Sequence, residues 1–262
     1  MDGGLHLLRY ELPSEVVAFS SYRQGGCSKG NYASFNVNSY CGDNPDYVAK
    51  NRKALCRKLG ISDNTLIIPH QVHGVQTLIV DEPFVRSLGD EKTALMLEGK
   101  DAVITNLRRV CVAVSTADCV PILVYDPNKR AVAAVHSGWR GTVKKIICET
   151  LKTMHEAYGT NSESVRIVIG PHIGLQAFEV GDEVYEQFEN AGFSMHTMTE
   201  RIGGHWHIDL SKANRFLLNG CGIKDSQIYD CGICCYTEST RFFSARRLGI
   251  DSGRTLSGIM LS

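Results

Sequence analysis

The stretch that decides the fold reads VPILVYDPNKRAVAAVHSGWRG and spans residues 120–141. Residues 120–125 and 131–135 are apolar runs rich in β-branched side chains, which is typical of strands buried in a sheet. Between them, residues 126–130 read DPNKR, a combination that favours a turn. We therefore expect an antiparallel hairpin of strands 120–125 and 131–135.

The pairing register of this hairpin decides which side chains meet beyond its strands. If Asp126 faces Ala131, then His136 faces Pro121, and side chains alternate between the two faces of the sheet. Cys119 then becomes the diagonal neighbour of His136 at roughly 7–8 Å, a spacing that suits two ligands of one metal ion. A bulge of one residue would turn His136 to the opposite face.

Strands and helices are mixed along the rest of the chain. The pattern predicts strands at 16–21, 65–68, 75–80, 102–105, 110–115 and 165–169, and helices at 45–59, 141–159, 182–190 and from 210 onward. Asn44-Pro45 and Gly60 supply the start and stop signals of the first helix. Because hairpins occur among these elements, we expect an α/β (α+β) fold with mixed β-sheets covered by helices, in a single domain over residues 1–262.

Composition excludes several classes of protein. The 262 residues are 43% hydrophobic, which a disordered chain would not be, and 28 basic residues balance 28 acidic ones. A chain without net charge has no global field to attract nucleic acid or anionic membranes. No apolar stretch reaches the ~20 residues of a membrane span, and the first residues lack a signal-peptide core. We expect a soluble, cytoplasmic protein that keeps most of its ten cysteines as thiols. Its partners should be small molecules, not nucleic acid or membranes.

Three residues form the candidate site. Cys119 lies in the segment ADCVP, where a carboxylate and a proline interrupt an apolar strand. Both residues are energetically unfavourable in a buried strand, so a strand that only filled the core would not need them. His136 ends its strand and precedes a glycine-containing helix start, whose free N–H groups can hold an anion. His73 from the loop QVHG would complete a set of two histidines and one cysteine. These three ligands would leave the fourth tetrahedral position of a zinc ion open for water or substrate.

Other interpretations remain open for the same residues. Taken singly, Cys119 is more often a small buried hydrophobe, and His73 or His136 a hydrogen-bonded loop residue. Cys119 as nucleophile with His136 as base would indicate a hydrolase or amide-editing enzyme, for instance one acting on cell-wall precursor peptides. Copper-dependent phenol oxidation would need more clustered histidines than nine scattered ones. Cys231 and Cys234 form a C-x₂-C pair, but a structural zinc site would need a second pair.

Several short blocks can be compared with known families. In chain order they are SYRQGGCS (21–28), SFN (34–36), GD (42–43), QVHG (71–74), DA (101–102), ADCVP (117–121), HSGWRG (136–141), GP (170–171), EVG (179–181) and FFSARR (242–247). Over nearly the whole chain these blocks resemble the laccase-domain (YfiH-like) family. The chain departs from the family pattern at Ser137 and Ala245, where a different small residue and a tyrosine are usual, and at Cys234-Cys235, where C-T is usual.

The resemblance implies a function and a cofactor. Members were first called multicopper polyphenol oxidoreductases and are now regarded as purine nucleoside phosphorylases with adenosine deaminase and methylthioadenosine phosphorylase activities. The resemblance implies zinc, with copper as the alternative metal, held by the residues matching His73, Cys119 and His136. It also implies a fold of β-sheets covered by helices. The implied partners are purine nucleosides and phosphate.

The two reactions need different groups. Zinc lowers the pKa of a bound water, which would suit attack on C6 of adenosine, and Cys119 and His136 are the expected catalytic residues. Phosphorolysis needs cations and donors around phosphate, for which Arg23, Arg140 and Gln71 are the candidates. An acid near N7 of the purine is also required, and Asp118 is the candidate for it.

Overall fold

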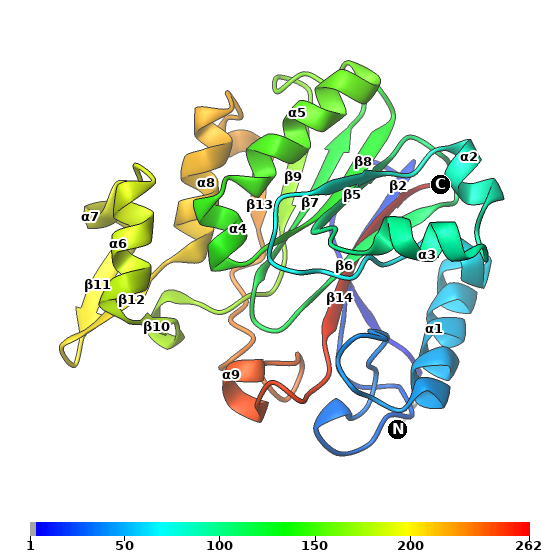
Figure 1. Cartoon of the computed structure of the whole chain (residues 1–262), viewed down its shortest axis with the longest axis horizontal. Helices are drawn as coiled ribbons and strands as arrows, with labels where there is room; N and C mark the ends of the chain where they lie inside the picture. The colour runs from blue at the N-terminus through cyan, green and yellow to red at the C-terminus, as the bar shows by residue number, and fades with distance from the viewer. Residues whose placement is uncertain (1–3) are drawn as a thin grey trace.

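The computed structural model describes residues 4–262 as three β-sheets with helices packed against them (Figure 1). Over these residues, the five-stranded sheet has the order β1 (Leu7–Arg9), β2 (Val16–Ser21), β14 (Thr255–Leu261), β6 (Cys111–Thr116) and β3 (Leu66–Ile67). The six-stranded sheet of the same part of the chain has the order β13 (Ile228–Asp230), β9 (Arg166–Ile169), β7 (Val120–Asp126), β8 (Ala131–Ser137), β5 (Ala102–Thr105) and β4 (Thr77–Ile79). The smallest sheet has the order β10 (Glu179–Val180), β12 (His205–Ile208) and β11 (Thr199–Ile202).

The helices are mostly short. They are α1 (Pro45–Leu59), α2 (Glu82–Arg86), α3 (Glu91–Leu97), α4 (Trp139–Val143), α5 (Ile146–Tyr158), α6 (Asp182–Asn190), α7 (Met195–Met198), α8 (Leu210–Gly220) and α9 (Ala245–Leu248). Within residues 4–262, none of them combines the length and the apolarity that crossing a bilayer requires. Both large sheets contain parallel and antiparallel pairs, so the predicted α/β (α+β) class with mixed sheets covered by helices is confirmed. That one domain spans residues 1–262 stays a prediction.

The hairpin of β7 and β8 has the register expected from the sequence. Pairing is continuous from Val120 opposite Ser137 to Asp126 opposite Ala131, with Pro121 opposite His136 and without a bulge. Asp126 closes the turn, because its Oδ1 atom accepts hydrogen bonds from the backbone N–H groups of residues 128 and 129 at 3.0 and 3.3 Å. The strands run further than predicted, to Asp126 and Ser137.

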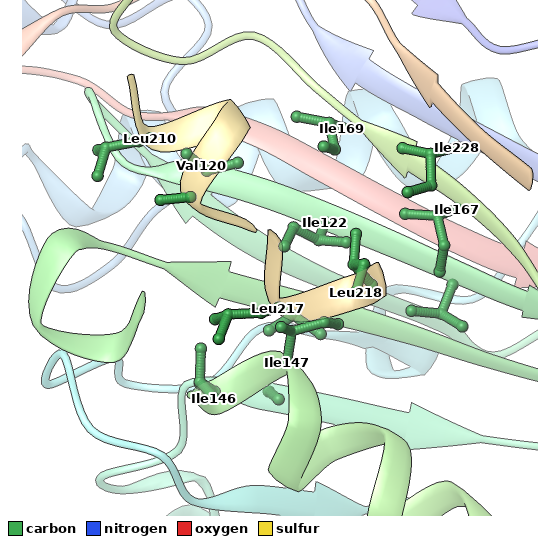
Figure 2. Packing of buried hydrophobic residues seen from close by; sticks show 14 of the residues in the cluster. Val120, Ile122, Ile146, Ile147, Ile167, Ile169, Leu210, Leu217, Leu218 and Ile228 are labelled. Atoms are coloured by element: carbon green, nitrogen blue, oxygen red, sulfur yellow. The ribbon is translucent and has the colours of Figure 1, made fainter. Parts of the chain in front are cut away.

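Alternation along β7 divides the core into layers. Val120, Ile122 and Val124 belong to the cluster that packs under α5 and α8, whereas Leu123 and Tyr125 belong to the cluster between the two large sheets. Figure 2 shows the first cluster, with side chains of β7 and β9 meeting those of α5 and α8. On the outer face of the five-stranded sheet, α1 covers a third cluster. The large sheets are therefore two inner layers between helices.

Helix α1 begins and ends where the sequence predicts. The Asn44 side chain accepts a hydrogen bond from the N–H of Asp46 at 2.9 Å, and Gly60 ends the helix with a left-handed φ of 70°. Leu55 on its inner face is fully buried. The helix thereby holds the outer side of the five-stranded sheet.

The helix predicted over 141–159 is wrong as a single helix. The structure divides it into α4 and α5, because Lys145 adopts a left-handed conformation with φ 62° and ψ 40°. Thr142 in α4 donates to the carbonyl of Gly138 and contacts Ser137, so α4 stays with the end of β8. The turn at Lys145 redirects the chain and lays the apolar face of α5 on the sheet.

Strand β14 lies in the middle of the five-stranded sheet, between β2 and β6. Ser20 pairs with Ser257, and their hydroxyl groups are 2.6 Å apart although 237 positions separate them in the chain. This sheet is thus built from segments that are distant in sequence.

Candidate metal centre

His136 is the best-buried residue of the site, at the end of β8. The residue is 3% exposed, and its Nδ1 atom lies 2.8 Å from Oδ1 of Asp101, which directly precedes β5. A carboxylate on one ring nitrogen fixes the orientation of the ring and leaves Nε2 for a metal or a reactant.

The same carboxylate also shapes the loop that carries His73. Asp101 accepts backbone hydrogen bonds from Val72, His73 and Gly74 at 3.2, 2.9 and 2.7 Å. His73 has a left-handed φ of 61°, a conformation that a histidine rarely adopts without support from its surroundings. A single buried side chain therefore positions both histidines.

Cys119 completes the set, immediately before β7. Its Sγ atom is 3.8 Å from Nε2 of His73, and the rings of His73 and His136 are 4.9 Å apart at an angle of 73°. One ligand atom from each of the three residues lies within 4.8 Å of the others. Two imidazole nitrogens and one thiolate sulfur are a donor set that suits zinc and also binds copper, so these residues fit a metal ion of this kind.

Gly138 allows this close approach. A Cβ atom added there would lie 2.8 Å from Sγ of Cys119 and 2.9 Å from Cδ2 of His73. Such distances are shorter than real Cβ contacts, so any larger residue would push the site residues apart. The close packing of Cys119 and His73 therefore requires a glycine at this position of the segment HSGWRG.

Charges within the cluster favour ionised forms. Burial raises the pKa of the Cys119 thiol, but the charge of His136 and hydrogen bonds from both histidines outweigh it and lower this pKa to about 6. Burial lowers the pKa of His136, but Cys119 and Asp101 outweigh it and raise this pKa to about 9. For Asp101, burial raises the pKa, whereas His136 and the loop N–H groups bring it below its usual value. The thiolate is the form of cysteine that binds metals and acts as a nucleophile.

Two cavities meet at Cys119. The first, of about 160 Å³, is lined by all three site residues and by polar neighbours that include Asn38, His70 and Arg254. The second is more apolar and lies against Cys119 alone of the three. Its other lining residues are Asp118, Trp139, Ile173, Phe178, Leu210 and Arg246.

Gln71 lines the first cavity, but its amide group is already engaged. Its Nε2 atom donates to the carbonyl of Ser115 at 2.9 Å, and its Oε1 atom accepts from the N–H of Ser115 at 2.8 Å. The side chain thus continues the pairing of β6 in the way a backbone would. Its role in binding substrate stays a prediction.

Neither arginine predicted to bind phosphate lines these two cavities. Arg23 donates from Nε to the carbonyl of Ala33 at 3.0 Å and from Nη1 to that of Ser239 at 2.6 Å. Arg140 is exposed on α4, with its guanidinium 4.1 Å from the ring centre of Trp139. Their binding of phosphate stays a prediction.

Asp118, predicted as the acid near the purine, lies on the second cavity and has both oxygens occupied. Oδ1 accepts from the thiol of Cys235 at 2.9 Å, and Oδ2 accepts from the N–H of Arg246 at 2.8 Å. These contacts hold the segment before Cys119 against α9. Its catalytic role also stays a prediction.

Sequence reasoning gave no role to several residues that the structure places at the site. Asp101 had a usable signal, because a carboxylate directly before the apolar run AVIT is costly to bury without a purpose. His70 and Arg254 had none, since their place at the cavity follows from the packing of distant loops.

The fold and the site together define a mixed α/β protein with a candidate mononuclear metal centre. A family model described as multi-copper polyphenol oxidoreductase laccase matches residues 17–262, and the chain belongs to this family. The resemblance inferred from the sequence blocks is therefore confirmed.

Similar proteins extend over almost the same length. A purine nucleoside phosphorylase of Bacteroides thetaiotaomicron is 45% identical over 251 residues, which cover 95% of this chain and 92% of that protein. A protein named adenosine deaminase RL5, from an unknown prokaryotic organism, is 39% identical over 246 residues, covering 93% of each chain. The crystal structure of the Bacillus licheniformis hypothetical protein YfiH superposes with a TM-score of 0.91 at 29% identity, covering 98% of this chain and 96% of that one. The names of the two relatives indicate that nucleoside-processing enzymes occur in this family.

Proposed function

We propose that the chain is a zinc-dependent purine nucleoside phosphorylase that also deaminates adenosine. Its substrates would be inosine, adenosine, guanosine and methylthioadenosine, each cleaved by phosphate to the free base and the sugar 1-phosphate. The observation that carries the proposal is the convergence of His73, Cys119 and His136 on one polar cavity. The names of the similar proteins support the substrate class.

The chain's own residues would prepare the site in three ways. His73, Cys119 and His136 would hold the metal, and Asp101 would keep both histidines in place through its hydrogen bonds. Gly138 would let the three groups approach each other. Zinc held there would supply a Lewis acid.

Phosphorolysis also needs positive charge near C1′ of the ribose, because the attacking phosphate is an anion and the bond breaks with charge separation. Arg254 is the arginine that lines the cavity of the three site residues. Its Nη1 and Nη2 atoms donate to the carbonyls of Ser252 and Ile250, which fixes the guanidinium beside the cavity. We assign phosphate contact to Arg254, with Arg23 and Arg140 as the more distant candidates.

The direct test is a product assay on metal-loaded protein. Inosine and phosphate should yield hypoxanthine and ribose 1-phosphate, and adenosine should also yield inosine and ammonia. Cys119→Ser, which removes the thiolate, should lose both the bound zinc and the activity, whereas Cys27→Ser, outside the cavity, should keep both. A zinc-loaded wild-type protein that is silent on all four nucleosides would reject the proposal.

The lowered pKa of Cys119 favours one second candidate, a hydrolase with Cys119 as nucleophile and His136 as base. The two functions differ in their response to metal. Zinc should protect Cys119 from iodoacetamide and chelation should abolish activity if the residue is a ligand. Capture of Cys119 together with substrate turnover in metal-free protein would favour the hydrolase.

A further inference from the structure

A third histidine lines the cavity shared by His73, Cys119 and His136. Nδ1 of His70 lies 2.5 Å from Oε2 of Glu98, and the ring of Tyr40 stacks on the imidazole at 4.3 Å and 16°. The backbones of His70 and Glu98 form a bridge, in which His70 donates to the carbonyl of residue 97 at 3.0 Å and residue 99 donates to that of His70 at 3.0 Å. Glu98 and Tyr40 therefore hold the ring, and the bridge holds the backbone that carries it.

This arrangement leaves one atom of the ring for chemistry. In the described part of the chain, Nδ1 is taken by the carboxylate, and Nε2 has no hydrogen-bond partner. A carboxylate on one ring nitrogen fixes the orientation of the ring and of its second nitrogen. His70 thus lines the cavity with one ring nitrogen held by a carboxylate and the other without a partner in the described part of the chain.

The other groups that line this cavity are less suited to donate a proton near neutral pH. Burial raises the pKa of Cys41 and of Tyr40, so both hold their protons too firmly. The guanidinium of Arg254 is engaged with the carbonyls of Ser252 and Ile250 and is assigned above to phosphate. His73 and His136 belong to the candidate metal set, which leaves His70.

We propose that His70, oriented by Glu98, donates the proton that the leaving purine needs during phosphorolysis, a role that rests on the function proposed above. A phosphate oxygen bonds to C1′ while the bond between C1′ and N9 breaks, and its electron pair passes into the purine ring. The proton on Nε2 of His70 moves to N7, so that the base leaves in neutral form. The phosphate gives up its own proton as it becomes the ester, and water carries that proton back to Nε2 of His70, so that protons balance.

The experiment compares two nucleosides on zinc-loaded, full-length protein. Inosine needs a proton on N7 to leave, whereas 7-methylinosine already carries positive charge in that ring and leaves without one. His70→Gln should lower kcat with inosine by about 100-fold or more, the usual contribution of general acid catalysis, while kcat with 7-methylinosine changes by less than about fivefold. Glu98→Gln should show the same selectivity with a smaller loss.

His196→Gln, an exposed histidine on α7, is the matched control and should leave both reactions unchanged. Zinc content and circular dichroism of the His70 variant should match the wild type. An equal loss with both nucleosides would show a structural role and overturn the proposal, as would full activity of His70→Gln with inosine. If wild-type protein cleaves neither nucleoside, the phosphorylase function itself has failed, which this comparison reveals separately.

Discussion

Asp101 organises the site although it does not belong to the candidate metal set. Its two oxygens accept three backbone hydrogen bonds from the loop of His73 and one interaction from the ring of His136. A carboxylate that is fully buried must satisfy its oxygens within the protein, and here every partner belongs to the site. The hydrogen bonds that stabilise the buried carboxylate therefore also fix the positions of His73 and His136.

Replacing this carboxylate should weaken metal binding. Asp101→Asn removes the charge and turns an NH₂ group toward backbone donors, so we expect zinc affinity to fall by about 10- to 100-fold. The free energy of unfolding should fall by about 1–3 kcal/mol, because a buried polar group loses its partner. Competition with a chromogenic chelator and chemical denaturation measure the two effects.

The control for this variant is Asp225→Asn, whose carboxylate is 70% exposed. It should change neither zinc affinity nor stability by a measurable amount. Unchanged zinc affinity in Asp101→Asn would contradict the positioning role.

Gly138 provides a test of packing at the same site. Gly138→Ala should lower zinc content and activity at least tenfold, because the new methyl group would overlap Cys119 and His73. Gly220→Ala adds a methyl group to a helix end with no atom within 4 Å and should be neutral. Metal analysis by mass spectrometry compares the two, and full metal content in Gly138→Ala would refute the steric argument.

Sequence reasoning could reach the pair of Cys119 and His136 because both flank one hairpin. The turn sequence sets the register of that hairpin, and register sets which side chains are diagonal neighbours. Asp101, His70 and Arg254 reach the site through contacts between distant segments, for which no local spacing exists. The approach of Cys119 to His136 was thus accessible from the sequence, and Asp101 had a signal at its own position, whereas the contacts that join Asp101, His70 and Arg254 to the site were not.

At the level of elements, boundaries with a specific backbone signal were predicted well. Helix α1 has a capping asparagine and a terminal glycine, and its bounds follow from them. The break between α4 and α5 has no such signal, since lysine is a good helix former. Tertiary contacts of Thr142 and the sheet impose the left-handed turn at Lys145.

This strained turn leads to a stability prediction. A left-handed conformation costs a non-glycine residue roughly 1 kcal/mol, and glycine avoids most of this cost. Lys145→Gly should therefore raise the free energy of unfolding by about 1 kcal/mol in urea denaturation. Lys144→Gly, at a φ of −82°, should bring no gain, and a loss of stability in Lys145→Gly equal to that of Lys144→Gly would contradict the argument.

At the scale of the whole molecule, the core between the two large sheets holds the five-stranded sheet against the six-stranded sheet. Leu123 on β7 lies in this core and is 1% exposed. It faces side chains from the five-stranded sheet, while its neighbours Ile122 and Val124 face the helices. Removing it should therefore affect the stability of the entire chain.

Leu123→Ala should lower the free energy of unfolding by about 2–5 kcal/mol, through lost burial and the cavity left behind. Leu95→Ala, on α3, is the matched control, because that side chain is 72% exposed and should change stability by less than about 0.5 kcal/mol. Calorimetry or urea titration distinguishes the two. A cost near zero at Leu123 would mean that the sheets do not depend on each other.

The central place of β14 has a consequence for how the protein is made. A ribosome delivers β2 early and β6 midway, but the strand that joins them is translated 237 positions after Ser20. Until it arrives, β2 and β6 each expose an unpaired edge, and such edges attract strands from other chains. We therefore expect newly synthesised chains to need chaperones until β14 has paired with both strands.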